Sequence, residues 1–350
     1  MDKRIYIRWI ILALLLVFVW MSMGLVDLSE WYAVRIYPSV SYGLSLFSSV
    51  FPFSVGDCFI VGSILGLFIY LIYSLIKRKN IGRMLRHTIE YLVWVYVWFY
   101  LSWGLNYFRH DFYARSGIQP VSYSSEEFAR FLDSYTDSLN ATFIRVDTIN
   151  KPLVAEETKK SYRNLPTKLR LVDPADHLKE KPMLSSVFMS KVGVKGYMNP
   201  FFTEFNLNQK LPPVSYPSTY THEMAHVLGI TSEAEANLYA YIVCTSSEIP
   251  EIRFSGYYSL FSYVIGTAKR LLSAEDFTVW IERLDPEIKK LYNEEASFWQ
   301  SLYDPTIGKI QDRIYNLFLK GNNISSGTMN YSQVIGLVIS LKSANYNLIR

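Results

Sequence analysis

The sequence predicts transmembrane helices at the N-terminus, followed by an α+β domain that is mainly α-helical and contains a small β-sheet. Two observations lead to this fold class. Half of the 350 residues are hydrophobic, and the long apolar runs lie before residue 108, which is typical of membrane spans. After Pro217 the sequence is predicted to be helical nearly to its end, which indicates a domain built largely of helices.

Three segments before residue 108 are expected to cross the membrane: residues 6–26, 53–76 and 89–107. A helix needs about 20 apolar residues to span a hydrocarbon core of about 30 Å. The first segment carries one charge, Arg8, and no small-x-small cleavage site follows its apolar run. We therefore expect a retained anchor and not a removed signal peptide.

The basic residues predict how these spans are oriented. The N-terminus carries Lys3, Arg4 and Arg8, and the loop between the second and third spans carries Lys77, Arg78, Lys79, Arg83 and Arg86. By contrast, residues 27–52 contain a single basic residue, Arg35. Because basic loops remain on the cytoplasmic side, the N-terminus is predicted inside and residues 109–350 outside, with membrane lipid as one partner.

Charge is distributed unevenly between the two parts. Residues 1–108 contain 9 Lys and Arg against 5 Asp and Glu, and residues 109–350 contain 26 of each kind. The net charge of +4 therefore belongs to the membrane part. A balanced outer domain lacks the basic surface that binds phosphates, so no nucleic-acid partner is expected.

The outer domain is long enough to form one core. Ser124, with Glu127 three positions later and apolar residues at helical spacing, predicts a capped amphipathic helix. Residues 181–208 are rich in Val, Phe, Gly and Pro, which favours two or three short strands with turns. We expect this small sheet directly before the helical stretch that follows Pro217.

That stretch contains the pattern His-Glu-x-x-His, with His222, Glu223 and His226. Residues four apart lie on one face of a helix, so both imidazoles can reach one metal ion. Catalytic zinc takes three protein ligands and leaves a fourth position for water, and a carboxylate must accept the proton of that water. His222 and His226 are predicted to bind Zn²⁺, and Glu223 is predicted to be the catalytic base.

The third ligand is expected shortly after the second histidine. Gly229 suits a helix end in the left-handed conformation, and Ser232 can cap a new helix. Two carboxylates compete for the ligand role, and a capping box with Ser232 would occupy Glu235. Glu233 is therefore the preferred ligand, with Glu235 as the alternative. Asn237, on the same face as Glu233, could support an imidazole or the carboxylate by a hydrogen bond.

Other residues could contact a substrate. Arg253, Tyr257 and Tyr258 follow on the next predicted helix and could stabilise an oxyanion, although packing of the tyrosines in the core explains them equally well. Residues 196–208 could form a sheet edge along which an extended peptide pairs, or an ordinary scaffold strand.

Four stretches of the sequence resemble an uncharacterised family of bacterial membrane proteins: HEMAHVLGITSEAEAN, WGLNYFR, GYMNPFFTE and YSQVIGLVISL. The resemblance covers nearly the whole chain. It implies a few N-terminal spans in the cytoplasmic (inner) membrane and a periplasmic zincin-like domain of unassigned function.

The segment from Glu233 to Asn237 is also similar to the Glu-x-x-Ala-Asp element of membrane-linked gluzincin peptidases, in which the first Glu binds zinc. This chain departs from that pattern by Asn237 in place of Asp and by a shorter gap after His226. The short gap resembles the metzincin arrangement, whose third ligand is a histidine at the place of Ser232.

Two functions follow from these residues. The first is a membrane-anchored zinc metallopeptidase that hydrolyses peptides or proteins outside the cytoplasmic membrane. The second is a non-catalytic sensor or assembly protein in which zinc only joins two helices. The second function predicts a closed site with four protein ligands and a loss of folding on chelation.

Overall fold

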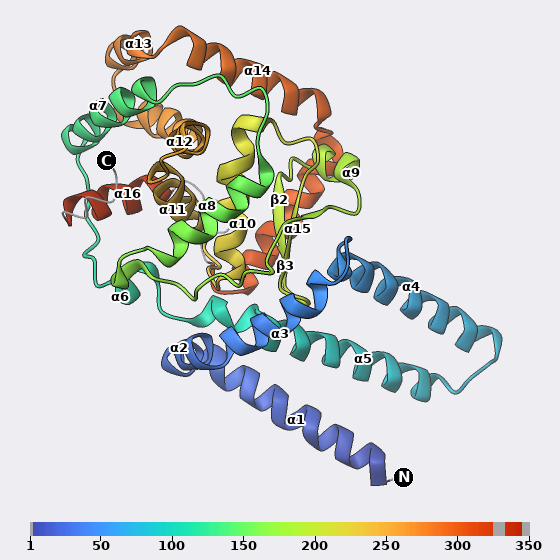
Figure 1. Ribbon diagram of the computed structural model, residues 1–350. Helices are drawn as coiled ribbons and strands as arrows, with labels where there is room; N and C mark the ends of the chain where they lie inside the picture. The colour runs from blue at the N-terminus through green and yellow to red at the C-terminus, as the bar shows by residue number, and fades with distance from the viewer. Residues whose placement is uncertain (1–2, 325–332, 345–350) are drawn as a thin grey trace.

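The chain folds into a helical body from which three long helices project (Figure 1). The computed structural model describes residues 3–324 and 333–344. The protein is mostly helical, with a small three-stranded sheet and an apolar helix at the N-terminus. These coarse features of the predicted fold class are confirmed.

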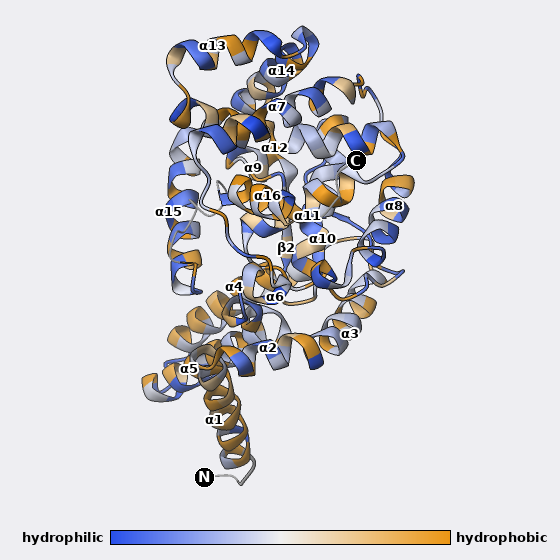
Figure 2. Cartoon of the chain, turned by 90° about the vertical axis from the view of Figure 1, so that its left-hand side faces the viewer, coloured by the Kyte–Doolittle hydropathy of each residue, from blue (hydrophilic) through white to orange (hydrophobic). Residues whose placement is uncertain are grey.

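The N-terminal part begins with an apolar helix and ends in a 3₁₀ turn. Its elements are α1 (Lys3–Gly24), α2 (Val26–Arg35), α3 (Tyr37–Ser49), α4 (Val55–Ile76), α5 (Ile81–Ser102) and η1 (Gly104–Phe108). Figure 1 shows α1 and the α4–α5 hairpin extending away from the body, and α1 is almost uniformly hydrophobic in Figure 2. Within residues 3–324 and 333–344, two helices are long and apolar enough to cross a membrane, Ile5–Gly24 and Val55–Ile76.

The third expected span, residues 89–107, corresponds only in part to α5. The helix starts earlier, at Ile81, because the Asn80 side chain caps it by accepting a bond from the Arg83 backbone at 3.1 Å. It ends at Ser102, and a 3₁₀ turn follows. Arg83, Arg86 and Glu90 therefore lie within the helix and lower its hydropathy. Residues 27–52, expected to be a loop, form the two helices α2 and α3.

The body is built around three helices that pack on one another: α10 (Tyr216–Val227), α11 (Glu233–Thr245) and α12 (Pro250–Leu271). The surrounding elements are α6 (Phe112–Ser116), α7 (Ser125–Ala141), α8 (Lys151–Arg163), η2 (Thr167–Leu169), α9 (Ser186–Lys191), η3 (Pro213–Ser215), α13 (Ala274–Arg283), α14 (Pro286–Leu302), α15 (Pro305–Gly321) and α16 (Val334–Ser343). The predicted capping box opens α7, since Ser124 and Glu127 exchange both bonds.

The sheet lies directly before α10 in the chain, as predicted. Its strands are β1 (Lys181–Pro182), β2 (Gly196–Asn199) and β3 (Glu204–Leu207), in the order β1-β3-β2. β2 pairs antiparallel with β3, from Gly196 opposite Leu207 to Asn199 opposite Glu204, and β1 pairs parallel with β3. β2 is therefore an edge strand, and it packs on α10.

Buried polar contacts join the sheet to the start of α4. Glu204 and Lys181 form a buried ion pair at 2.6 Å. The second carboxylate oxygen of Glu204 accepts from the backbone of Gly56 at 2.7 Å. Asp57 accepts from the hydroxyl of Tyr197 on β2 at 2.5 Å. The edge strand beside α10 is thus fixed to the first turn of a candidate membrane helix.

Candidate metal centre

The histidines of the motif lie on α10, which ends where the sequence predicts. Gly229 adopts the left-handed conformation with φ of +95°, so the chain reverses immediately after the helix. Ser232 then caps α11 by accepting a bond from the Glu235 backbone at 3.3 Å. Because the connection is this short, the first turn of α11 returns to the face of α10 that carries His222 and His226.

Three side chains converge at this place. Nε2 of His222 and Nε2 of His226 are 3.1 Å apart. Oε2 of Glu233 lies 3.1 Å from the first nitrogen and 3.4 Å from the second. Tetrahedral zinc with bonds of 2.0–2.1 Å separates its ligand atoms by about 3.3 Å. The spacing of these three atoms therefore suits one zinc ion.

Hydrogen bonds behind the cluster orient both imidazoles. Nδ1 of His222 donates to Oδ1 of Asn237 at 2.9 Å, and Nδ1 of His226 donates to the carbonyl of Ile230 at 2.6 Å. With a proton on Nδ1, each imidazole in its neutral form presents the lone pair of Nε2 to the common centre. Asn237 is itself held by a bond to the hydroxyl of Tyr263 at 3.2 Å. This is the supporting position that the sequence predicts for Asn237.

Glu233 and Glu235, the two competing carboxylates, lie in different surroundings. Glu233 contacts both histidines, and its other oxygen accepts from the hydroxyl of Tyr315 at 2.6 Å. Glu235 instead forms a buried ion pair with Arg115. Residues two positions apart point to nearly opposite sides of a helix, so of these two carboxylates Glu233 is the one that lies with the histidines.

Glu223 lies beside the cluster and is 4% exposed. Its Oε2 is buried without a hydrogen-bond partner. Gly196 of β2 lies against this carboxylate, and a Cβ added at residue 196 would lie 2.4 Å from Oε1 of Glu223. Strand β2 can pass this close because residue 196 has no side chain. A buried carboxylate oxygen with no partner is costly in a folded protein, and such groups commonly mark a site of function.

The charges in the cluster are strongly coupled. Burial raises the pKa of Glu223 to about 7, partly opposed by His222 and His226. Burial would also raise the pKa of Glu233, but the two imidazoles hold it well below its usual range. For His226 burial acts in the lowering direction, and the charge of Glu233 outweighs it and raises the pKa to about 9. Glu233 is therefore the anion of the cluster.

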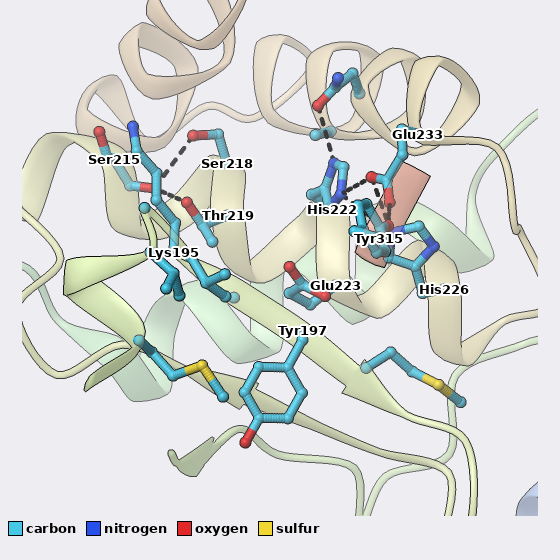
Figure 3. A pocket seen from close by; sticks show the side chains of 18 of the residues that line it. Lys195, Tyr197, Ser215, Ser218, Thr219, His222, Glu223, His226, Glu233 and Tyr315 are labelled. Atoms are coloured by element: carbon cyan, nitrogen blue, oxygen red, sulfur yellow. Dashed lines mark hydrogen bonds and ion pairs between the residues drawn. The ribbon is translucent and has the colours of Figure 1, made fainter. Parts of the chain in front are cut away.

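The cluster opens into a cleft of about 980 Å³ that runs along α10. One end holds His222, His226 and Glu233, and Lys195, Ser215 and Thr219 lie toward the other end (Figure 3). Gly196, Tyr197 and Met198 of β2 line the cleft, as do residues of α14 and α15. The cleft is large enough for several residues of an extended peptide.

Of the three predicted substrate contacts on α12, only Tyr258 lines the cleft. Its buried hydroxyl faces Glu295. Tyr257 is on the other side of the helix, where its ring packs edge-on against Tyr241 in the core. Arg253 lies one turn earlier and donates to the carbonyl of Ser247. The three side chains are close in sequence but do not all project from the same side of α12.

Two further residues support the site without any signal in the local sequence. Tyr315 comes from α15 and holds Glu233. Trp103, at the end of α5, donates its indole N–H to the carbonyl of His226 at 2.8 Å. Both are distant in sequence from the residues they support. The only sequence sign was that Trp103 lies within WGLNYFR, one of the stretches that carry the family resemblance.

The fold and the site define a helix-rich protein with candidate membrane helices and a His, His, Glu cluster suited to a metal. The chain belongs to the family of proteins of unknown function DUF3810, whose family model matches residues 32–339. No curated protein and no solved structure is significantly similar to it. The expectation of an uncharacterised family is confirmed, and its zincin character stays a prediction.

Proposed function

We propose that this protein is a membrane-anchored zinc metallopeptidase that hydrolyses peptide bonds outside the cytoplasmic membrane. One observation carries the proposal. Nε2 of His222, Nε2 of His226 and Oε2 of Glu233 converge beside Glu223, whose buried Oε2 has no partner. A buried, unpaired carboxylate oxygen destabilises a fold, so the position of Glu223 is better explained by a function than by folding.

The donor set fits zinc. Two neutral imidazoles and one carboxylate are a common ligand set of catalytic zinc, and each donor here is oriented by a second hydrogen bond. When bound, zinc supplies a Lewis acid that polarises a carbonyl and a water molecule. Among the residues that the structure describes, the group of possible ligands comprises His222, His226 and Glu233, with no fourth member. Three ligands favour an open catalytic site over a closed structural one.

The chain's own residues then supply the remaining chemistry. Glu223 is placed to take a proton from the attacking water and to return it to the leaving nitrogen, as general base and then general acid. Burial at the side of the cleft keeps its carboxylate away from bulk water. The backbone of edge strand β2 borders the same cleft and can pair with an extended peptide. Tyr258, farther along the cleft, is placed to contact the substrate.

The membrane location rests on α1 and α4, which are both long and apolar enough to span a bilayer. The basic residues at the N-terminus and between α4 and α5 favour an N-terminus inside the cell. The cleft would then face the extracytoplasmic side, the periplasm in a bacterium with two membranes.

The test compares wild type with Glu223→Gln, using the full chain purified in detergent without chelators. Metal content is measured by mass spectrometry, and hydrolysis is measured on a peptide library. We expect about one zinc per chain in both proteins and hydrolysis only in the wild type, because glutamine cannot accept the proton. Undiminished hydrolysis by Glu223→Gln would refute this mechanism.

His226→Ala is the control for the metal, and we expect it to lose zinc and activity together. If the wild type binds zinc, hydrolyses no peptide and unfolds on chelation, the non-catalytic function replaces this proposal.

A further inference from the structure

Helix α3 has an unusual surface for a helix on the outside of a protein. Its sequence, YPSVSYGLSLFSS, contains no charged residue. The exposed positions form one uncharged stripe that includes Tyr42, Leu46 and Phe47, and Val50, which follows the helix, is 75% exposed. A helix that faces water normally carries charged side chains on its outer face. This stripe is therefore suited to a surface other than water.

The opposite face of α3 is occupied by the body. Ser45 contacts Nε2 of His177 at 2.9 Å, and the carbonyl of Ser48 accepts from the amine of Lys181. The apolar stripe thus points away from the body. On α2, Trp31 and Val34 are also about half exposed, at 50% and 51%. Both helices thus expose apolar and aromatic side chains, although α2 also exposes the charged Asp27 and Arg35. Exposed apolar groups of this kind mark a site of contact.

The position of this surface identifies the contact. α2 and α3 connect α1 directly to α4, the two helices apolar enough to span a bilayer. Both Figure 1 and Figure 2 show α3 lying crosswise to α1, between the projecting helices and the body. Helices that lie along a bilayer surface insert an apolar face at the headgroup boundary, where Trp and Tyr are enriched. Lipid at this level would cover the stripe.

The candidate metal centre is tied to the same segment. Tyr37, the first residue of α3, donates its hydroxyl to the carbonyl of Val227 at 2.6 Å. Trp103, directly after α5, donates to the carbonyl of the ligand His226. One hydrogen bond therefore joins the C-terminal end of α10 to α3, and another joins it to the end of α5. The metal-binding end of the cleft is the end nearest the projecting helices.

The lining of the cleft includes aromatic side chains at the end near the projecting helices. At the end near α5, the lining includes Phe99, Tyr107 and Phe318, which pack on one another. The far end holds the ion pair of Lys195 and Glu295 at 3.0 Å, together with the ring of Trp299. A chain that entered from the bilayer side would meet apolar and aromatic side chains first.

We propose that α2 and α3 lie in the headgroup layer of the bilayer, and that the cleft acts on substrates that are themselves attached to the membrane, close to the point where they leave it. The substrate part rests on the proposed peptidase function. The location of α2 and α3 stands independently of it.

The location is tested with a fluorescent probe on a single cysteine in the full chain, reconstituted in vesicles. Leu46→Cys carries the probe, and Glu126→Cys on exposed helix α7 is the control, both in a Cys58→Ser background because Cys58 is exposed and Cys244 is buried. Lipids with a spin label near the headgroup should quench the probe at position 46 several-fold more than at position 126. Equal quenching at the two positions would overturn the location.

The substrate part is tested with peptides linked to a lipid anchor in the same vesicles. The spacer between anchor and peptide varies from about 3 to about 20 residues, roughly 10 to 70 Å when extended, and the free peptides are the reference. We expect short spacers to be accepted and cleaved at least tenfold faster than the free peptides.

The two failures are distinguishable. If only long-spacer and free peptides are cleaved, the peptidase function holds and the membrane-proximal substrate is wrong. If the zinc-loaded wild type cleaves no peptide, the proposed function fails and the substrate part fails with it, while the quenching result still decides the location of α3.

Discussion

Replacing Gly196 by alanine should disable Glu223 without disturbing the metal. The new Cβ would lie 2.4 Å from Oε1 of Glu223 and 2.8 Å from its carboxyl carbon, whereas ordinary contacts begin near 3.4 Å. The carboxylate must therefore move by about 1 Å, since the backbone of β2 is fixed by its pairing with β3. Residue 196 has no left-handed φ, so alanine adds no backbone strain.

The size of the effect follows from that displacement. A catalytic group misplaced by about 1 Å typically loses about 100-fold in rate, which corresponds to about 2.7 kcal/mol in activation free energy. We expect Gly196→Ala to lower kcat by about this factor, because the change displaces the group that transfers the proton. Zinc content should stay at the wild-type level, since Oε1 of Glu223 is not among the converging ligand atoms.

The assay combines hydrolysis of the best library peptide, metal content and thermal unfolding of the full chain. Gly266→Ala is the matched control, because a Cβ at this exposed position on α12 meets no atom within 4 Å. The control should keep its activity. Wild-type kcat in Gly196→Ala, with zinc present, would refute the placement of Glu223 as the general base.

Three further predictions concern the supporting residues. Glu233→Ala should lose zinc, as metal analysis would show. Glu235→Ala should keep zinc, but thermal unfolding should show a free energy of unfolding lower by about 3 kcal/mol, because Arg115 loses its ion-pair partner. If Glu235→Ala alone lost zinc, the assignment of the two carboxylates would be reversed. Tyr315→Phe removes the bond to Glu233 and should weaken zinc affinity by about 10- to 100-fold, measured by competition with a chelator; an unchanged affinity would make the bond incidental. Burial would raise the pKa of Glu295, but Lys195 holds it below the ordinary value of 4.5, so the carboxylate stabilises the fold above pH 4.5 and this stabilisation is lost as the pH falls through the lowered pKa. The free energy of unfolding, measured from pH 7 to pH 3, should therefore fall less steeply in Glu295→Gln than in the wild type. Identical slopes would contradict this reasoning.

Features that depend on nearby residues could be predicted from the sequence. The turn at Gly229, the cap at Ser232 and the convergence of Glu233 with both histidines all depend on a stretch of twelve residues, 222–233. Within such a stretch, helical spacing and capping preference decide where each side chain points. Glu233 was preferred to Glu235 because a capping box with Ser232 would occupy Glu235. Glu233 does lie beside the histidines, but the Glu235 carboxylate is paired with Arg115, a partner that the local sequence does not indicate.

Features that depend on the path of the whole chain could not be predicted. Tyr315 reaches Glu233 only because α14 and α15 return to the cleft, and nothing within the sequence of α15 indicates that turn. The separation of Tyr257 from Tyr258 depends on which face of α12 packs on α11. Residues 27–52 were expected to be a loop because they lie between the first two predicted spans. Their helices pack on the body on one side, and such contacts override weak local preference.

The bond from Trp103 to the carbonyl of His226 has a practical consequence for purification. A shortened, soluble chain that starts at Arg109 would lack both Trp103 and Tyr37. It would leave the carbonyls of His226 and Val227 without these donors and would expose the end of α10 to solvent. Zinc affinity measured on such a fragment would describe a loosened helix end, so the full chain in detergent or lipid is the material in which this site can be characterised.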